Sequence, residues 1–148
     1  MKIISHRGNL NGPSPTENDP DTIDKVLSCT DFDVEIDVWH INNDWFLGHD
    51  KPKYRIPLEW LTLNSNELWM HAKNLAAYQS LLENDAIQKV FWHQKDDFSL
   101  VKNGLIWTYP DLPLTTRSIA NIHEPITQTP LCYGICTDYP KSINNFKK

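Results

Sequence analysis

Short apolar runs, each only a few residues long, recur along the whole chain. Most of them end in a polar or titratable residue, and prolines lie mainly in the connections between them. Runs of this length and composition predict β-strands, each with a chemically active side chain near its carboxyl end. The predicted strands cover residues 2–5, 33–39, 45–49, 68–73, 89–94, 105–109, 118–122 and 133–138.

Four segments between these runs are compatible with helices, and Asn74 is a suitable N-cap for one of them. Strands that alternate with helices usually pair in parallel, and a (β/α) barrel gathers its functional residues at the carboxyl ends of its strands. A complete barrel needs about 250 residues. We therefore predict an α/β fold, an abridged (β/α) TIM-type barrel with some helices shortened or missing. The predicted helices cover residues 18–28, 58–61, 74–83 and 142–147.

Composition narrows the classes of protein that the chain can belong to. With 148 residues, 40% of them hydrophobic, and neither a repeat nor an evident linker, residues 1–148 are predicted to form a single domain. The formal net charge of -5 argues against nucleic acid as a partner. No apolar run approaches the length of a membrane span, and no secretory leader pattern is evident, so we expect a cytoplasmic protein. Composition leaves the oligomeric state open.

The run from residue 33 to residue 38 alternates strictly between acidic and apolar side chains. On a strand, Val34, Ile36 and Val38 share one face, while Glu35 and Asp37 share the other. Two carboxylates on one face must be solvated, share a proton or bind a cation. The apolar flanks favour burial, and burial makes a cation more necessary.

Two histidines and an arginine stand where apolar runs end. His6 and His49 can supply a general base and a general acid, and Arg7 has the planar shape that holds phosphate oxygens. Glu35 and Asp37 can hold a divalent metal ion. This combination of groups is the one that cleavage of a phosphodiester requires.

Five short motifs, in the same order, resemble those of the glycerophosphodiester phosphodiesterases, which belong to the phosphatidylinositol phospholipase C-like barrels. They span almost the whole chain, and two further stretches, residues 105–109 and 133–140, are similar to late strands of that family. The chain thus resembles a short, divergent member. The motifs are His6-Arg7-Gly8, Glu17-Asn18, Glu35-Ile36-Asp37, Gly48-His49-Asp50 and Thr137-Asp138.

The resemblance implies a metal-dependent phosphoric diester hydrolase that acts on a small glycerol-type phosphodiester. Two alternatives use the same residues: a catalytically weak barrel that binds a phosphorylated ligand, and a lyase that forms a cyclic phosphate. The implied roles are general acid–base catalysis by His6 and His49, phosphate binding by Arg7 and Lys73, and metal binding by Glu35 and Asp37.

The chain departs from the family pattern at its third metal ligand. The family has a Glu two residues before the lysine, and His71 occupies that place before Lys73. The expected cofactor is Mg²⁺ or Ca²⁺, with Mn²⁺ as the alternative because imidazole suits softer ions. Glu17, His93 and Trp107 are further candidates, with His71, for the mouth of the site.

Two other polar residues are assigned no role in the site. His123 precedes Glu124 and Pro125, and we interpret it as a loop residue. Asp33 precedes the alternating run and is expected to end a turn.

Overall fold

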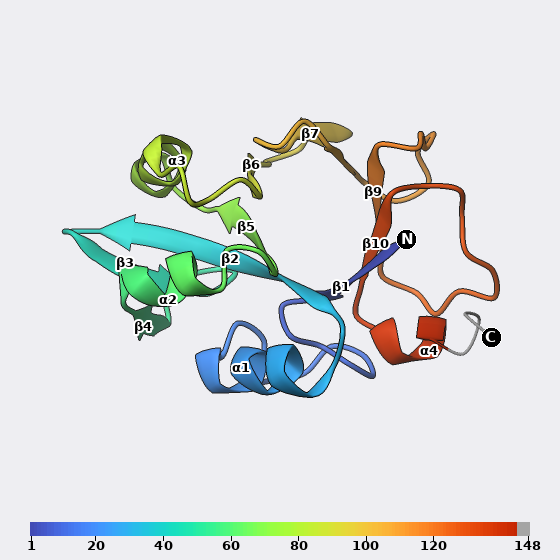
Figure 1. The fold of residues 1–148 in the computed structure, drawn as a ribbon, viewed down its shortest axis with the longest axis horizontal. Coiled ribbons are helices and arrows are strands. Elements are labelled where there is room, and N and C mark those ends of the chain that lie inside the picture. Colours follow the sequence, from blue (N-terminus) through green and yellow to red (C-terminus); the bar gives the residue numbers. More distant parts are fainter. Residues whose placement is uncertain (145–148) are drawn as a thin grey trace.

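A computed structural model describes residues 1–144, which contain ten strands and four helices (Figure 1). In chain order these are β1 (Lys2–His6), α1 (Pro20–Cys29), β2 (Asp33–Ile41), β3 (Asp44–Leu47), β4 (Tyr54–Ile56), α2 (Leu58–Leu63), β5 (Leu68–Ala72), α3 (Leu75–Glu83), β6 (Val90–Trp92), β7 (Phe98–Leu100), β8 (Ile106–Thr108), β9 (Ser118–Ile122), β10 (Gly134–Thr137) and α4 (Pro140–Asn144).

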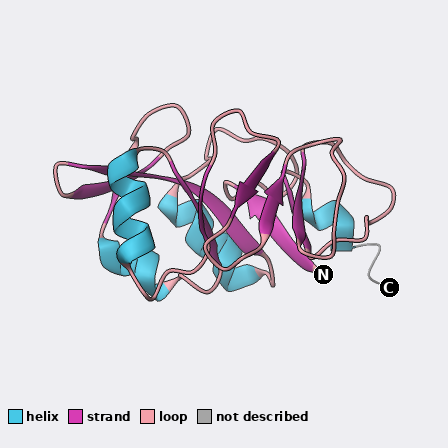
Figure 2. Ribbon diagram, turned by 90° about the horizontal axis from the view of Figure 1, so that it is seen from above, coloured by secondary structure: helices cyan, strands magenta, loops and turns pink. Residues whose placement is uncertain are grey.

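All ten strands belong to one mixed sheet that curls around an interior. Seven strands run parallel in the order β6-β5-β2-β1-β10-β9-β8, and β7 pairs with β8 in the antiparallel direction. β3 pairs in the antiparallel direction with the second half of β2, and β4 pairs in the antiparallel direction with β3. The curl is visible in Figure 1, and Figure 2 shows helices on the outside of the strands.

The predicted (β/α) TIM-type barrel is wrong, because the sheet is a mixed half-barrel and helices make up only 20% of the chain. Between α3 and α4 the described chain contains no helix. Four prolines lie in the connections on either side of β9, and each removes a backbone donor and restricts the residue before it. These connections therefore form loops. The prolines are Pro110, Pro113, Pro125 and Pro130.

The positions of most strands and helices were predicted correctly, although the architecture was not. Each of the eight predicted strands overlaps a strand of the structure, whereas β4 and β7 were missed. Asn74 caps α3 as predicted, and its side chain accepts a hydrogen bond from the backbone of Ala77 at 3.1 Å. The last predicted helix begins inside α4, and its residues 145–147 lie outside the described part. Among the described helices, none is long and apolar enough to cross a bilayer.

Apolar side chains form two clusters, one on each face of the curled sheet. The outer cluster packs α1 and α3 against the sheet, with Ile23 and Leu81 fully buried. The inner cluster fills the curl with aromatic side chains, among which Trp107 stacks on Phe91 with ring centroids 4.4 Å apart. The inner cluster forms the floor beneath the polar residues that follow.

The prediction that Asp33 ends a turn is wrong. Asp33 is the first residue of β2 and is 2% exposed. Its carboxylate accepts hydrogen bonds from Lys2 Nζ at 2.8 Å and Lys89 Nζ at 2.9 Å. Trp69 Nε1 donates a third at 2.9 Å. Since a buried carboxylate is stable only when its charge is compensated, this group acts as an ionic plug at the lower end of the curl.

Candidate functional site

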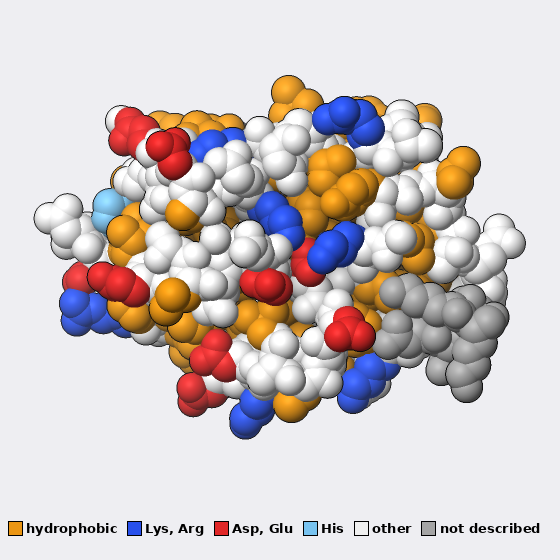
Figure 3. Space-filling view, viewed as in Figure 1, with side chains coloured by type: hydrophobic (Ala, Val, Ile, Leu, Met, Phe, Trp, Pro, Cys, Tyr) orange, Lys and Arg blue, Asp and Glu red, His pale blue; other side chains and the backbone are white. Residues whose placement is uncertain are grey.

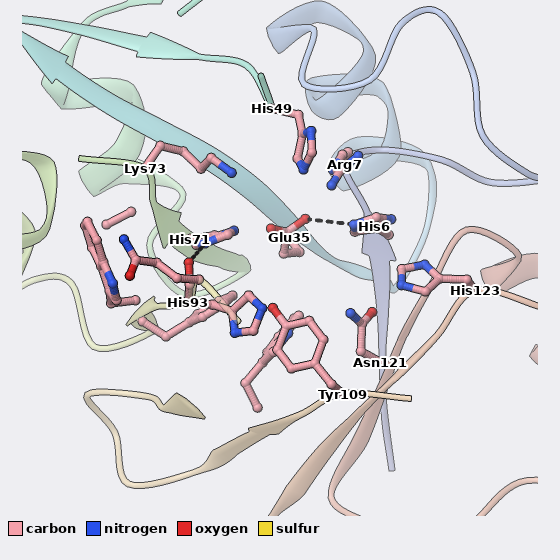
Figure 4. Close-up of a pocket in the computed structure, with 15 residues that line it drawn as sticks. His6, Arg7, Glu35, His49, His71, Lys73, His93, Tyr109, Asn121 and His123 are labelled. Atoms are coloured by element: carbon pink, nitrogen blue, oxygen red, sulfur yellow. Dashed lines mark hydrogen bonds and ion pairs between the residues drawn. The ribbon is translucent and has the colours of Figure 1, made fainter. Parts of the chain in front are cut away.

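A cavity of about 440 Å³ opens at the carboxyl ends of the parallel strands. In the view of Figure 3 the surface is hollowed near its centre, where basic and acidic side chains meet apolar ones. Figure 4 shows that the polar side chains around this cavity come from several strands and point toward one another. The labelled lining residues are His6, Arg7, Glu35, His49, His71, Lys73, His93, Tyr109, Asn121 and His123.

A sharp turn at the end of β1 presents His6 and Arg7 to the cavity. Arg7 and Gly8 both have positive φ angles, 54° and 86°, so the chain reverses immediately after the strand. Asn18, also at positive φ, donates its backbone N–H to the Arg7 carbonyl at 3.0 Å. The left-handed region is strained for Arg, and such strain is found mainly where the surroundings enforce it.

Glu35 and Asp37 lie on the inner face of β2, as the alternation predicts, and are 3% and 0% exposed. Asn18 holds Asp37 twice: its Nδ2 donates to Oδ2 at 2.9 Å, and its Oδ1 accepts the Asp37 backbone N–H at 2.9 Å. Glu35 Oε2 and Asp37 Oδ1 are buried without a hydrogen-bond partner. Orphaned oxygens of this kind are uncommon in folded proteins and indicate a missing partner.

Burial and charge move the pKa values of these two carboxyl groups in opposite directions. Burial, together with the neighbouring charge of Asp37, raises the pKa of Glu35 well above its usual value. Burial alone would also raise the pKa of Asp37, but contact with His71 and the charges of Arg7 and Lys73 outweigh it and hold that pKa far below its usual range. The pair therefore contains one well-compensated carboxylate, Asp37, and one, Glu35, for which the charges of Arg7 and Lys73 do not outweigh the cost of burial.

Two residues of the segment at β5 complete the group around Asp37. His71 Nδ1 lies 3.1 Å from Asp37 Oδ1, and Lys73 Nζ lies 3.6 Å from the same oxygen. On the other side, Arg7 Nε lies 3.1 Å from Asp37 Oδ2. The register explains this convergence, because Asp37 pairs with His71 across parallel β2 and β5.

The residues around the orphaned oxygens fit a divalent cation. Glu35, Asp37 and His71 each offer one ligand atom, and these atoms all lie within 4.8 Å of one another. Two carboxylate oxygens and one imidazole nitrogen suit Mn²⁺ or Zn²⁺ better than Ca²⁺, which takes more ligands, all of them oxygen. The donor set thus favours the alternative Mn²⁺ over the expected Mg²⁺ or Ca²⁺.

His49 lies at the rim of the cavity, on the loop that follows β3. Its side chain is 44% exposed, and its Nδ1 lies 2.8 Å from Asp50 Oδ1. Gly48 shapes this loop: a Cβ atom there would lie 2.1 Å from the Lys51 carbonyl oxygen. Figure 4 shows the His49 ring beside Arg7, directed into the cavity.

His6 is oriented by a carboxylate on the neighbouring strand. Its Nδ1 lies 2.8 Å from Oδ1 of Asp138, which directly follows β10, and its Nε2 lies 3.8 Å from Glu35 Oε2. Asn9 Nδ2 donates to the same Asp138 oxygen at 2.7 Å. Burial lowers the pKa of His6 despite this carboxylate, so its ring favours the neutral form.

The remaining candidates, Glu17, His93 and Trp107, differ in their position relative to the cavity. Glu17 does not line this cavity. Its carboxylate accepts hydrogen bonds from Arg7 Nη1 at 3.1 Å and from Asn9 Nδ2 at 2.8 Å, and the first of these bonds positions the Arg7 side chain. His93 lines the cavity and stacks on Tyr109 with ring centroids 3.6 Å apart. Burial, followed by the charge of His71, lowers the pKa of His93 to about 4. Trp107 lies 2% exposed in the floor.

Sequence reasoning left four residues in or beside the cavity without a role. His123, interpreted as a loop residue, lines the cavity and reaches the Asp138 carboxylate; Tyr109 and Asn121 also line the cavity. Asp138 was noticed as part of a motif but given no function. Each of the four lies on or just after the carboxyl end of a strand, and that position was the available signal.

Comparison of the chain with models of protein families, with curated proteins and with solved structures finds no match in any of the three. The family suggested by the motifs therefore stays a prediction.

Proposed function

We propose that the chain is a metal-dependent phosphodiesterase that hydrolyses a small glycerol-type phosphodiester. The observation that carries this proposal is the convergence, at one cavity, of two histidines, an arginine, a lysine and the buried carboxylate of Glu35, with the fully buried Asp37 carboxylate in contact with Arg7 and Lys73. The resemblance of the motifs supports the same reading. We keep the expectation of a small-molecule partner and a cytoplasmic location.

The balance of charge suits a monoanionic phosphodiester. Arg7 and Lys73 offset the charges of Glu35 and Asp37, so a divalent cation at the carboxylates would leave the cavity positive. When bound, that cation would polarise the phosphoryl group and stabilise the charge that develops on its oxygens. Arg7 can hold phosphate oxygens in a planar fork, whereas Lys73 acts as a point charge.

The two histidines divide the proton transfers. A neutral His6 whose Nδ1–H donates to Asp138 has an unprotonated Nε2 that faces the cavity, which is the form of a general base. It takes a proton from the water molecule that attacks phosphorus. His49, more exposed and at the rim, protonates the leaving alcohol. Each of these roles is worth on the order of 10² to 10⁴ in rate.

The direct test is a screen of glycerophosphodiesters and bis(p-nitrophenyl) phosphate with Mg²⁺, Ca²⁺ or Mn²⁺ in turn. We expect turnover by the parent chain and a loss of at least roughly 100-fold in His6→Ala. His40→Ala is the matched control, since His40 also lies on this sheet but stacks on Trp45, away from the cavity. Activity that survives in His6→Ala would contradict the proposal, as would phosphorylated-ligand binding without turnover.

A second test concerns the metal preference. His71→Glu restores a carboxylate at the place of the family's third ligand, so it should tighten Mg²⁺ or Ca²⁺ binding and raise activity when metal is limiting. His71→Ala should lower Mn²⁺-supported activity more than Mg²⁺-supported activity. If neither variant changes the preference, His71 is a wall residue and not a ligand.

A further inference from the structure

Beside the carboxylate group lies a second cluster of potential metal ligands. Asp138 stands between two histidine rings: its Oδ1 lies 2.8 Å from His6 Nδ1, and its Oδ2 lies 3.5 Å from His123 Nδ1. The two rings meet edge to face with centroids 5.3 Å apart. One ligand atom from each residue lies within 4.8 Å of the others.

The register of three adjacent strands brings these residues together. Ser5 of β1 pairs with Thr137 of β10, and Thr137 pairs with Ile122 of β9. The next residue along each strand direction is His6, Asp138 or His123. Neighbouring side chains along a strand point to opposite faces, so all three reach the inner side of the curl. Figure 4 shows His6 and His123 side by side at the cavity wall.

We propose that His6, His123 and Asp138 form a second cation site, selective for zinc-type ions that prefer nitrogen ligands. Two imidazoles and one carboxylate are the donor set of three-ligand zinc sites, which keep a fourth position open. The carboxylate pair on β2 offers mostly oxygen, so the two sites differ in the ions they favour.

The surroundings of Asp138 prepare it as a ligand. The Asp138 side chain is buried, and its carboxylate lies within hydrogen-bonding distance of His6, His123 and Asn9. Asn9 Nδ2 donates to Asp138 Oδ1 at 2.7 Å and fixes its orientation. Loss of a hydrogen bond of this kind to a ligating carboxylate typically lowers metal affinity by about 10- to 100-fold.

The cluster needs only small movements to accept an ion. Bonds of about 2.0–2.1 Å in tetrahedral geometry place ligand atoms roughly 3.3 Å apart. The distance from His6 Nδ1 to Asp138 Oδ1 is 2.8 Å, and the distance from His123 Nδ1 to Asp138 Oδ2 is 3.5 Å, so the two lie on either side of that value. The His123 side chain is 45% exposed and follows the end of β9, so an ion can reach the cluster from solvent and the ring has room to adjust.

Occupancy of this site would switch off the chemistry proposed above. An ion on Nδ1 of His6 forces the remaining ring proton onto Nε2, and a protonated Nε2 cannot accept a proton from the attacking water. Zinc would therefore inhibit the enzyme at the base itself. This consequence rests on the proposed function, whereas the binding of zinc does not.

The test is a count of zinc equivalents bound by the full chain, with Co²⁺ as a spectroscopic probe of four-coordinate geometry. We expect two equivalents in the parent and one in His123→Ala, with the second weakened more than roughly 10-fold. Asp138→Asn should also lose one equivalent, and circular dichroism checks that each variant is folded. His40→Ala, as control, should keep both.

His71→Ala separates the two sites, because it should lose the other equivalent while keeping the one that depends on His123. If the parent binds a single ion that disappears only in His123→Ala, the second site stands and the carboxylate site of the proposed function fails. A single ion lost in both variants would be one shared site and would overturn the inference. Two equivalents retained in His123→Ala, or none in the parent, would overturn it as well.

Discussion

The inner face of β2 carries three acidic residues whose surroundings differ. At the lower end, Asp33 is compensated by two lysines and an indole N–H. Two and four residues further along the same face, Glu35 and Asp37 each retain a buried oxygen without a hydrogen-bond partner. Their burial is the same, since all three are at most 3% exposed.

This difference separates a structural carboxylate from one that is ready for a ligand. A buried carboxylate whose charge is fully compensated stabilises only the fold, and removing it leaves its partners unpaired. A buried carboxylate with an orphaned oxygen lowers stability until a cation or a proton arrives. The following substitutions test whether the two ends of β2 differ in this way.

Asp33→Asn should have the largest effect on stability. It removes the charge that compensates Lys89, whose side chain is only 16% exposed, and weakens the plug at the lower end of the curl. Breaking a buried pair in this way costs about 3–5 kcal/mol. Urea unfolding of the variant and the parent measures the difference in free energy of unfolding. A change below about 1 kcal/mol would mean that Asp33 is not a structural charge.

Glu35→Gln, with a chelator present, should have a smaller effect of the opposite sign. In the folded protein burial and Asp37 raise the pKa of Glu35, so the folded chain keeps this proton after the unfolded chain has lost it. Stability of the parent therefore falls as pH rises above the unfolded pKa of about 4.3. At neutral pH the variant should be more stable by about 1 kcal/mol, the scale of an unsatisfied buried group.

The pH dependence of the stability gained in Glu35→Gln is the control for this prediction. Below the unfolded pKa both forms of the parent carry a protonated Glu35, and the advantage of Glu35→Gln should vanish. Urea unfolding at about pH 4 and pH 7 measures both values. An advantage that is equal at the two pH values would show that Glu35 carries no desolvated charge.

Lys2→Met should have the smallest effect. The Lys2 side chain is 46% exposed, and Asp33 keeps its bonds to Lys89 and Trp69 when Lys2 is lost. Half-exposed ion pairs contribute about 0–1 kcal/mol, and salt screens them. Unfolding of this variant in low and high salt would detect the difference. A loss as large as that of Asp33→Asn would show that Lys2 alone compensates the carboxylate.

Local patterns predicted the elements of the fold because each depends on a few neighbouring residues. The alternation around Glu35 and Asp37 identified both the strand and its polar face. The turn after His6 and the N-cap at Asn74 are also local. Convergence of His6, Arg7, Lys73 and the carboxylates followed from their common position at the carboxyl ends of strands.

The architecture was beyond these patterns because it depends on pairing between distant segments. The antiparallel pairs of β3 with β2 and of β7 with β8 leave no periodic signal that distinguishes them from parallel pairs. Asp138 and His123 were likewise missed, since only the register of β1, β10 and β9 places them beside His6. Each of them stands two residues before a proline, and nothing in that local sequence indicates which residues lie beside it on the neighbouring strands.

The most direct test of the account is the gain in unfolding free energy that Mn²⁺ gives to four chains measured together. The parent should gain about 2.7 kcal/mol at a Mn²⁺ concentration 100 times its dissociation constant. Asp33→Asn, although less stable, should keep that gain, because Asp33 lies outside the cation site. Glu35→Gln and Asp37→Asn should lose most of it. A gain that persists in these two variants, or that disappears equally in Asp33→Asn, would contradict the division of β2 into a structural end and a cation-binding end.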